Sequence, residues 1–354
     1  MYSIFIAPSG QIKRLLLLML LAVVALVLLL AGCSSKKDNG AGTASGPAGT
    51  AAQDESNLVR CPLTGEKVTE TALQRRPLAV MIENSPAARP QSGLNKADIV
   101  YEMLAEGDIT RFMAVFLHGD AGELGPVRSA RPYFIERALD YNAVYVHCGG
   151  SEAAKQMVSQ EQVAHLDEFS IGRRAFWRVR TRKAPHNLYT DTEKLRRVAA
   201  QKGYEEMPEI TPFRFSEAGE TAAAGRASAG PTIHYPRVYN VAMFKYDNKQ
   251  KLYKRYTGGR PHKDSFTGEQ LTARNIIVQY VNTKVIDEAG RRAMNMEGSG
   301  RALLFTGGKV YEGRWNKAGL RSRTVFSDEY GEEFKLNPGQ TWIEVVPQRT
   351  RVDA

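Results

Sequence analysis

The chain has 354 residues, a formal net charge of +10 at pH 7 and three cysteines. Only one segment, near the N-terminus, is apolar enough to approach the length of a membrane span, so a protein with several transmembrane helices is excluded. Beyond residue 57 about 300 residues remain, which is enough for two domains with cores of their own.

The N-terminus has the pattern of a lipoprotein signal. Lys13 and Arg14 precede an apolar run over 15–30, and Ala31 and Gly32 then precede Cys33. Two cations, an apolar region and small residues before a cysteine predict a signal peptide over 1–32, after which Cys33 takes a diacylglyceryl group. Two or more acyl chains, at ~0.8 kcal/mol per buried CH₂, anchor a protein durably. The alternative is an ordinary N-terminal membrane helix.

A lipidated tether is predicted over 33–57. The segment is rich in Gly, Ala, Ser and Thr and has almost no hydrophobic side chains, so it cannot bury enough surface to fold. Random-coil scaling gives it a reach of roughly 25–30 Å. We therefore expect the folded part to lie close to the outer face of the cytoplasmic membrane.

The first folded segment, 58–215, mixes strand and helix patterns. Short apolar runs predict strands over 77–82, 99–103, 112–117 and 143–146. Helices are predicted over 132–140, 151–158 and 192–200. Strands joined by helices indicate a layered α/β or α+β domain.

A linker is predicted over 216–231, where small residues show no apolar periodicity. The segment that follows, 232–350, is expected to be a smaller and mostly β domain. It has a hairpin pattern over 241–256, a strand over 275–285 and a meander over 302–346.

Positive charge is concentrated after the linker. Residues 33–230 hold 25 basic and 25 acidic side chains, whereas residues 231–354 have a net charge of +8. Such a surface attracts anionic neighbours, which outside a membrane are phospholipid headgroups or phosphate-bearing glycans of the wall. Nucleic acid does not fit this compartment. The alternative is that the charge serves solubility alone.

Three sequence segments could build an anion-binding site. In the first, a predicted strand runs into Gly149, Gly150 and Ser151 and then a helix, so that backbone amides can meet an anion. The alternative is an ordinary strand-to-helix turn.

In the second segment, Arg128, Ser129 and Arg131 stand at the start of a predicted helix, where the helix dipole disfavours cations. A cation in such a place suggests that it grips a carboxylate or a phosphate. Structural pairing with Glu83, Glu102, Glu106 or Asp108 is the alternative.

The third segment is Arg173–Asn187. Arg178, Arg180 and Arg182 alternate, so on a strand they would share one face, with Trp177, His186 and Asn187 close by in sequence. This pattern suits an acidic glycan, although arginine is also frequent at exposed strand positions. We predict that Arg128, Arg131, Arg178 and His186 converge on one concave surface.

Two cysteines, Cys61 and Cys148, remain after Cys33 is lipidated. In an oxidising compartment an even pair suggests a disulfide. The alternatives are a nucleophilic Cys148 and two free thiols. His147 is a poor base for Cys148, because adjacent strand residues point to opposite faces.

The sequence resembles the YerB-like lipoproteins of Gram-positive bacteria, a two-domain family of unknown function. The resemblance rests on Cys61-Pro-Leu-Thr-Gly65, on Gly125-Pro-Val-Arg-Ser-Ala-Arg131, on Ala184-Pro-His-Asn187 and on Leu336-Asn-Pro-Gly-Gln-Thr-Trp342. It implies a two-domain lipoprotein and supplies no reaction. The family usually has other residues at the positions of Cys61 and Cys148, which argues against a family-wide cysteine nucleophile.

Two classes of function follow from these patterns. The first is a non-catalytic lipoprotein that binds an anionic envelope component or scaffolds a cell-wall synthesis protein. The second is a hydrolase or transferase acting on wall polymer, with His186, Glu102 or Glu106 as acid or base and Arg128 and Arg131 holding charge. Zinc-ligand spacing, a Walker loop, a G-x-S-x-G elbow and a dinucleotide fingerprint are missing from the sequence, so no metal or cofactor is expected.

Overall fold

The computed structural model describes residues 57–217 and 225–354. These residues belong to one compact unit, Asp54–Ala354. The predicted signal peptide, the lipidation site Cys33 and nearly all of the tether therefore lie outside the described residues. In the described part of the chain, no helix is long and apolar enough to cross a membrane.

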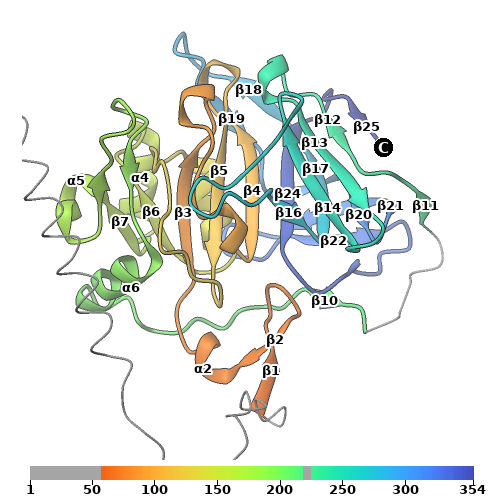
Figure 1. The fold of residues 1–354 in the computed structure, drawn as a ribbon, viewed down its shortest axis with the longest axis horizontal. Helices are drawn as coiled ribbons and strands as arrows, with labels where there is room; N and C mark the ends of the chain where they lie inside the picture. The colour runs from red at the N-terminus through yellow and green to blue at the C-terminus, as the bar shows by residue number, and fades with distance from the viewer. Residues whose placement is uncertain (1–56, 218–224) are drawn as a thin grey trace, which may run out of the picture. The chain divides into compact units, whose positions relative to one another are not determined.

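A mixed eleven-stranded sheet runs through this unit (Figure 1). In spatial order its strands are β11 (Arg226–Ala227), β21 (Lys309–Lys317), β20 (Gly298–Thr306), β17 (Asn275–Val281), β24 (Thr341–Pro347), β4 (Ile99–Leu104), β5 (Thr110–Phe116), β3 (Leu78–Glu83), β6 (Val144–His147) and β7 (His165–Asp167), and β22 (Val325–Asp328) pairs with β21.

Parallel pairing of β24 with β4 joins the two halves of the chain. Thr341 to Val345 pair in register with Ile99 to Met103, and the other side of β24 pairs with β17. These central strands are buried on both faces, which explains their near-continuous apolar sequence. Residues on both sides of the predicted linker at 216–231 therefore share one sheet.

A second, six-stranded sheet packs against one face of the large sheet. Its strands are β15 (Arg260–Pro261), β14 (Leu252–Thr257), β13 (Ala242–Asp247), β12 (Thr232–Ile233), β25 (Val352–Asp353) and β16 (Thr272–Ala273). Alternate residues of β14 are buried, as expected for a strand with one solvated face. Phe244 of this sheet meets Trp342 of the large sheet edge-on, with ring centroids 5.7 Å apart.

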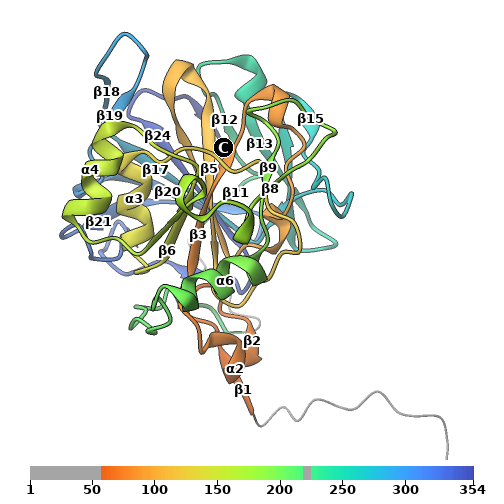
Figure 2. The ribbon, with the colours of Figure 1, turned by 90° about the vertical axis from the view of Figure 1, so that its left-hand side faces the viewer.

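Most of the α-helices of the described residues lie near the end of the large sheet formed by β6 and β7, whereas the first of them lies beside β2 (Figures 1 and 2). The helices are α2 (Glu70–Leu73), α3 (Pro132–Leu139), α4 (Glu152–Gln160), α5 (Glu168–Ile171) and α6 (Thr192–Gln201). The hydroxyl of Tyr101 on β4 lies 2.6 Å from that of Tyr141, directly after α3. Because successive strand residues point to opposite faces, α3 covers the face opposite to the one that Glu102 presents to the second sheet.

Four strand pairs complete the described structure. They are β1 (Leu58–Arg60) with β2 (Lys67–Thr69), β8 (Trp177–Arg178) with β9 (Leu188–Tyr189), β10 (Arg214–Phe215) with β23 (Lys335–Leu336), and β18 (Thr283–Val285) with β19 (Arg292–Met294).

The predicted fold class, an α+β part followed by a mostly β part, is confirmed. The four predicted N-terminal strands and the three predicted helices form within a few residues of their expected bounds. Two predictions for the C-terminal part need correction. The strand expected over 275–285 ends at Val281, and Thr283–Val285 forms a separate hairpin with β19. β24 does not join the meander expected over 302–346 but lies between β17 and β4, because its apolar side chains on both faces suit the centre of a sheet.

Candidate functional site

Several residues predicted for the anion site, among them Arg128, Gly149 and His186, lie near one edge of the large sheet. β3, β6 and β7 are mutually parallel neighbours, so their carboxyl ends meet at the same edge, where ligands bind in many open α/β sheets. The loop that carries Arg128 crosses this edge. The Arg128 amide donates to the Met81 carbonyl, and the Cys148 amide donates to the Arg128 carbonyl. The convergence follows from strand order and from this loop.

Glu83, the last residue of β3, is the centre of one cluster at this edge. Its carboxylate lies 2.9 Å from Nδ1 of His186 and 3.3 Å from Nε of Arg128, and it accepts a hydrogen bond from Ser85 at 2.7 Å. Glu83 is buried, whereas His186 keeps 27% of its side chain exposed. Two residues predicted for the anion site, Arg128 and His186, therefore share one buried carboxylate.

Glu106 is the centre of a second cluster. Its carboxylate pairs with Arg131 at 2.6 Å and with Arg111, whose guanidinium also donates to the Ser129 carbonyl at 3.1 Å. Burial alone would raise the pKa of Glu106, but the two guanidinium groups outweigh it and hold this pKa below its usual value. Arg131 therefore serves its own chain, as the alternative interpretation of this segment expected.

Arg178 also has a carboxylate partner. It lies 3.7 Å from Glu168 and donates to Asn187 Oδ1 at 3.1 Å. The thiol of Cys148 lies 3.5 Å from the other oxygen of Glu168. Burial, and then the charge of Glu168, raise the pKa of Cys148 to about 11. A thiol so strongly protonated at neutral pH is a poor nucleophile.

The strand-to-helix turn is closed by the chain itself. Ser151 caps α4 as predicted, its hydroxyl accepting from the Ala154 amide at 3.3 Å. The Gly149 amide donates to Asp167 at 2.8 Å, and Gly150 forms a bridge to Ala130. Because a carboxylate of the chain already occupies the Gly149 amide, this turn offers less to an external anion than the sequence predicted.

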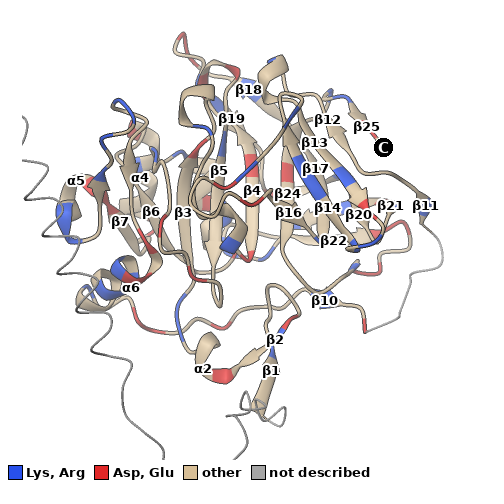
Figure 3. Ribbon diagram, viewed as in Figure 1, with Lys and Arg blue, Asp and Glu red and all other residues tan. Residues whose placement is uncertain are grey.

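Unpaired positive charge remains on residues 173–187, which we call the basic arm. Arg173, Arg174, Arg180 and Lys183 are exposed, and among the described residues none of them pairs with a carboxylate. Figure 3 shows basic residues following α5 at this end of the sheet. The four residues of the predicted single site each have a carboxylate partner, which argues against one shared anion site. The unpaired positive charge at this edge lies on the arm instead.

The structure corrects the predicted Cys61–Cys148 disulfide, because both thiols are free. Cys148 follows the carboxyl end of β6, whereas Cys61 contacts His118, beyond the end of β5 and so near the start of β3. The length of β3, about 17–20 Å at ~3.3 Å per residue, separates the two. A disulfide needs Cα atoms about 5–6 Å apart.

His118 itself is held by acidic neighbours. Its Nδ1 atom lies 2.7 Å from buried Asp98. Burial alone would lower the pKa of His118, but Asp98 and the Cys61 thiol together raise it to about 10. The imidazole is therefore cationic at neutral pH. Among the described residues, no group of His, Cys, Asp and Glu side chains has the geometry of a metal site.

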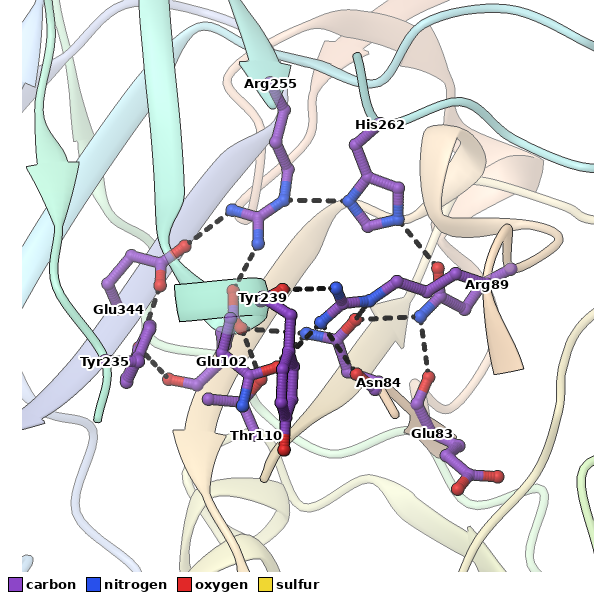
Figure 4. A network of polar contacts seen from close by, with 12 residues as sticks. Glu83, Asn84, Arg89, Glu102, Thr110, Tyr235, Tyr239, Arg255, His262 and Glu344 are labelled. Carbon is purple, nitrogen blue, oxygen red and sulfur yellow. Dashed lines mark hydrogen bonds and ion pairs between the residues drawn. The ribbon is translucent and has the colours of Figure 1, made fainter. Parts of the chain in front are cut away.

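A buried polar network, which the sequence did not reveal, lies between the two sheets (Figure 4). The Arg255 guanidinium pairs with Glu102 and lies 3.0 Å from Glu344, and all three side chains are fully buried. The same guanidinium stacks 4.3 Å from the ring centroid of Trp342. Glu102 and Glu344 are neighbours in register on β4 and β24. Arg255 thus ties the second sheet to the junction between the two halves.

Charge balance in this network requires a proton. Burial, and then the charge of Glu102, raise the pKa of Glu344 to about 8. One protonated carboxyl, one carboxylate and one guanidinium sum to zero, which is the state that a dry interior favours. Tyr235 donates to Glu344 at 2.9 Å and satisfies one of its oxygens.

The network continues to the edge where Glu83 lies. Nε of Arg255 donates to Nδ1 of His262 at 3.1 Å, and Nε2 of His262 donates to Gln91 at 2.7 Å. Gln91 donates in turn to the Glu83 carbonyl at 2.8 Å. Burial, and then Arg255, lower the pKa of His262 well below its usual value, so this imidazole is neutral and holds one tautomer.

The residues suggested for a hydrolase are less available than the sequence implied. Glu102 is fully buried beneath the second sheet and cannot contact a polymer. Glu106 is occupied by two arginines, which leaves His186, held by Glu83, as the accessible acid–base group of that set.

A groove of about 880 Å³ lies elsewhere, on β20 and β21. Four basic and five acidic side chains are among the residues that line it, so it carries little net charge. It contains none of the predicted site residues.

The fold and the junction define a two-domain α+β protein whose halves share one sheet. Two family models match these halves, the N-terminal domain of a protein of unknown function (DUF3048) over residues 63–205 and its C-terminal domain over 232–343. The chain therefore belongs to the DUF3048 family.

Similarity to one relative, in both sequence and structure, supports this assignment. The chain is 36% identical over 297 residues to "Putative lipoprotein YerB" of Bacillus subtilis (strain 168), covering 84% of this chain and 89% of the relative. The crystal structure of the YerB protein from Bacillus subtilis superimposes with a TM-score of 0.76 at 35% identity, covering 84% of this chain and all of that one. The predicted family resemblance is confirmed.

Proposed function

We propose that this protein is a lipid-anchored, extracytoplasmic lipoprotein that binds an anionic component of the cell envelope through the basic arm, without catalysis. The anchor is supported by the motif ending at Cys33 and by the name of the Bacillus relative. The expected ligands carry phosphate or carboxylate groups, as acidic glycans and phospholipid headgroups do.

The observation that carries the binding role is the unpaired charge of the arm. Arg173, Arg174, Arg180 and Lys183 are exposed cations without carboxylate partners in the described structure. Exposed cations with no internal carboxylate partner can exchange solvent for an external anion without breaking an existing ion pair.

Hydrogen bonds to the rest of the molecule hold the arm in place. Its hairpin, β8 and β9, is extended by a bond from the Val179 amide to the Asn187 carbonyl. Arg182 donates to the carbonyls of Ala88 and Pro90, and His186 pairs with Glu83. Arg182 and His186 thus position the arm, while Arg180 and Lys183 face the ligand.

The test is binding of labelled poly(glycerol phosphate) by the full-length chain in neutral detergent, with uncharged dextran as the control polymer. The double variant Arg180→Ala/Lys183→Ala should bind about 5- to 30-fold more weakly, since each exposed ion pair contributes up to about 1 kcal/mol. The matched variant Lys249→Ala/Lys284→Ala removes the same charge from exposed positions of the C-terminal part. An equal loss in both would assign binding to overall charge and contradict the proposal.

One observation favours the second candidate, a hydrolase or transferase acting on wall polymer. His186 is oriented by a buried carboxylate and remains partly exposed, as an acid–base histidine would be. Release of new reducing ends or free amines from purified wall by the same preparation, lost in His186→Gln, would replace the binding proposal with this one.

A further inference from the structure

Phe169 is an exposed aromatic residue beside the basic arm. It lies on α5 and is 78% exposed, although large apolar side chains usually avoid water. Its ring lies over Gly149, where a Cβ atom would come within 2.6 Å of the ring. Gly149 has φ +60°, so both the backbone conformation and the covering ring favour glycine here.

Cations follow Phe169 closely in the sequence. Arg173 and Arg174 lie in the 3₁₀ turn that follows α5 (Gly172–Arg174). Arg174 is directed back to this helix, donating to the carbonyls of Ser170 and Ile171. Arg178 pairs with Glu168, the neighbour of Phe169. Two guanidinium groups, those of Arg174 and Arg178, thus contact the helix that carries the exposed ring, and the two further cations of the arm follow between β8 and β9.

This combination fits a bilayer surface better than a soluble polymer. At a membrane, aromatic rings settle at the headgroup level while basic side chains meet lipid phosphates. Each Lys or Arg near an anionic surface contributes to attraction that salt screens. A polyanion free in solution offers charge for the arginines but no apolar phase for the ring.

We propose that the basic arm docks on the surface of an anionic bilayer, with Phe169 inserted at the boundary of the acyl chains and Arg173, Arg174, Arg180 and Lys183 on lipid phosphates. This inference rests on the proposed function and names the bilayer as the source of the anion. The predicted tether from Cys33 keeps the folded part within roughly 25–30 Å of such a surface.

The experiment uses the full lipid-anchored chain reconstituted in vesicles. A Phe169→Trp variant reports insertion through quenching by lipids brominated on their acyl chains, measured against the unsubstituted chain. We expect quenching in phosphatidylglycerol vesicles, and its loss in phosphatidylcholine vesicles, in high salt and in the Arg180→Ala/Lys183→Ala background. Phe266→Trp is the matched control, because Phe266 is 63% exposed but lies outside the arm.

A second measurement needs no substitution. Trypsin cleavage after Arg180 and Lys183 of the anchored, unsubstituted chain should be slower in phosphatidylglycerol than in phosphatidylcholine vesicles. Equal quenching at 169 and 266, or equal cleavage in both lipids, overturns the bilayer inference.

The two proposals fail in different ways. If poly(glycerol phosphate) still binds through Arg180 and Lys183 while quenching and protection are absent, the arm binds a polymer and only the bilayer inference falls. If the arm variants change neither polymer binding nor membrane contact, both proposals fall.

Discussion

Arg255→Met should destabilise the protein strongly, because Arg255 forms the direct ion pairs with both buried carboxylates of this network in the described structure. Met fills similar space against Trp342 and Phe244, whose rings lie 4.3 and 4.9 Å from the guanidinium carbon. Glu344 already holds a proton near neutral pH, so the substitution removes the ion-pair partner of Glu102, which keeps only its hydrogen bonds from Asn84 and Thr110. Removing one partner of a buried pair costs about 3–5 kcal/mol.

An independent route gives the same magnitude. Once Arg255 is lost, Glu102 can avoid a buried charge only by taking a proton from solvent at pH 7. Protonating an ordinary glutamate, whose pKa in water is about 4.3, costs about 4 kcal/mol at pH 7, at 1.36 kcal/mol per pH unit. The penalty should shrink at pH 5, where protons are more abundant.

Urea unfolding followed by tryptophan fluorescence measures this cost. We expect the midpoint for Arg255→Met to fall by more than about 1 M, given a slope of a few kcal/mol per M. The triple variant Arg255→Met/Glu102→Gln/Glu344→Gln should recover at least half of the loss, because no buried charge remains. Arg321→Met, which breaks an exposed pair with Glu161, serves as the control and should change stability little.

Two results would refute this reasoning. If Arg255→Met costs less than about 1 kcal/mol, water reaches the network and its burial is not effective. If the triple variant is no more stable than the single one, the loss comes from packing around Arg255 and not from the uncompensated carboxylate.

Two further predictions concern protonation and thiol chemistry. Stability should fall as pH rises from about 4.5 to 8, because the folded state keeps the proton of Glu344, and from about 6.5 to 10, because it keeps the proton of His118. In urea unfolding measured across this pH range, Glu344→Gln and His118→Gln should each flatten their own part of the stability curve. A stability curve that rises with pH would contradict both assignments. A thiol reagent should count both Cys61 and Cys148 as free after denaturation without reductant, and a count of zero would restore the disulfide. Native Cys148 should react with iodoacetamide at pH 8 about a hundredfold more slowly than an ordinary thiol.

The sequence predicted the fold class because local patterns carry that information. The apolar run at 77–82 and the Pro-initiated helix at 132–140 formed where period and capping rules place them. The place of β24 between β17 and β4 was not predictable, since pairing across more than 240 residues leaves no local signal.

The candidate site was partly predictable, because residue types are local information whereas their partners come from distant segments. The residue types around Arg128, Arg178 and His186 indicated a polar cluster, and strand order brings them to one edge. Their carboxylate partners, Glu83, Glu106 and Glu168, come from other segments, so the sequence did not show that these charges are balanced internally. Arg255 resembled an ordinary strand residue until its burial was known.

The end of β3 and the loop that follows it connect the basic arm to the buried network around Arg255. Glu83 and Asn84 are consecutive residues, and their side chains diverge toward different partners. Glu83 faces His186 and Arg128 at the surface, whereas Asn84 donates to Glu102 at 2.9 Å inside the network. A shift of this loop would therefore disturb both groups together.

Two arginine side chains, one from the loop itself and one from the basic arm, hold the loop over 84–91 in place. Arg89 donates to Asn84 at 2.9 Å and reaches Asn240 of the second sheet's segment at 2.8 Å, while Arg182 of the basic arm donates to the carbonyls of Ala88 and Pro90. An exposed arm would lose conformational entropy on binding unless its base were already ordered. Because residues 84–91 join the arm to a fully buried network, the structure supplies that order before any ligand arrives. The buried charges between β4 and β24 cost stability to desolvate, but the network they form holds the base of the arm in place. From this ordered base Arg180 and Lys183 can bind an anion.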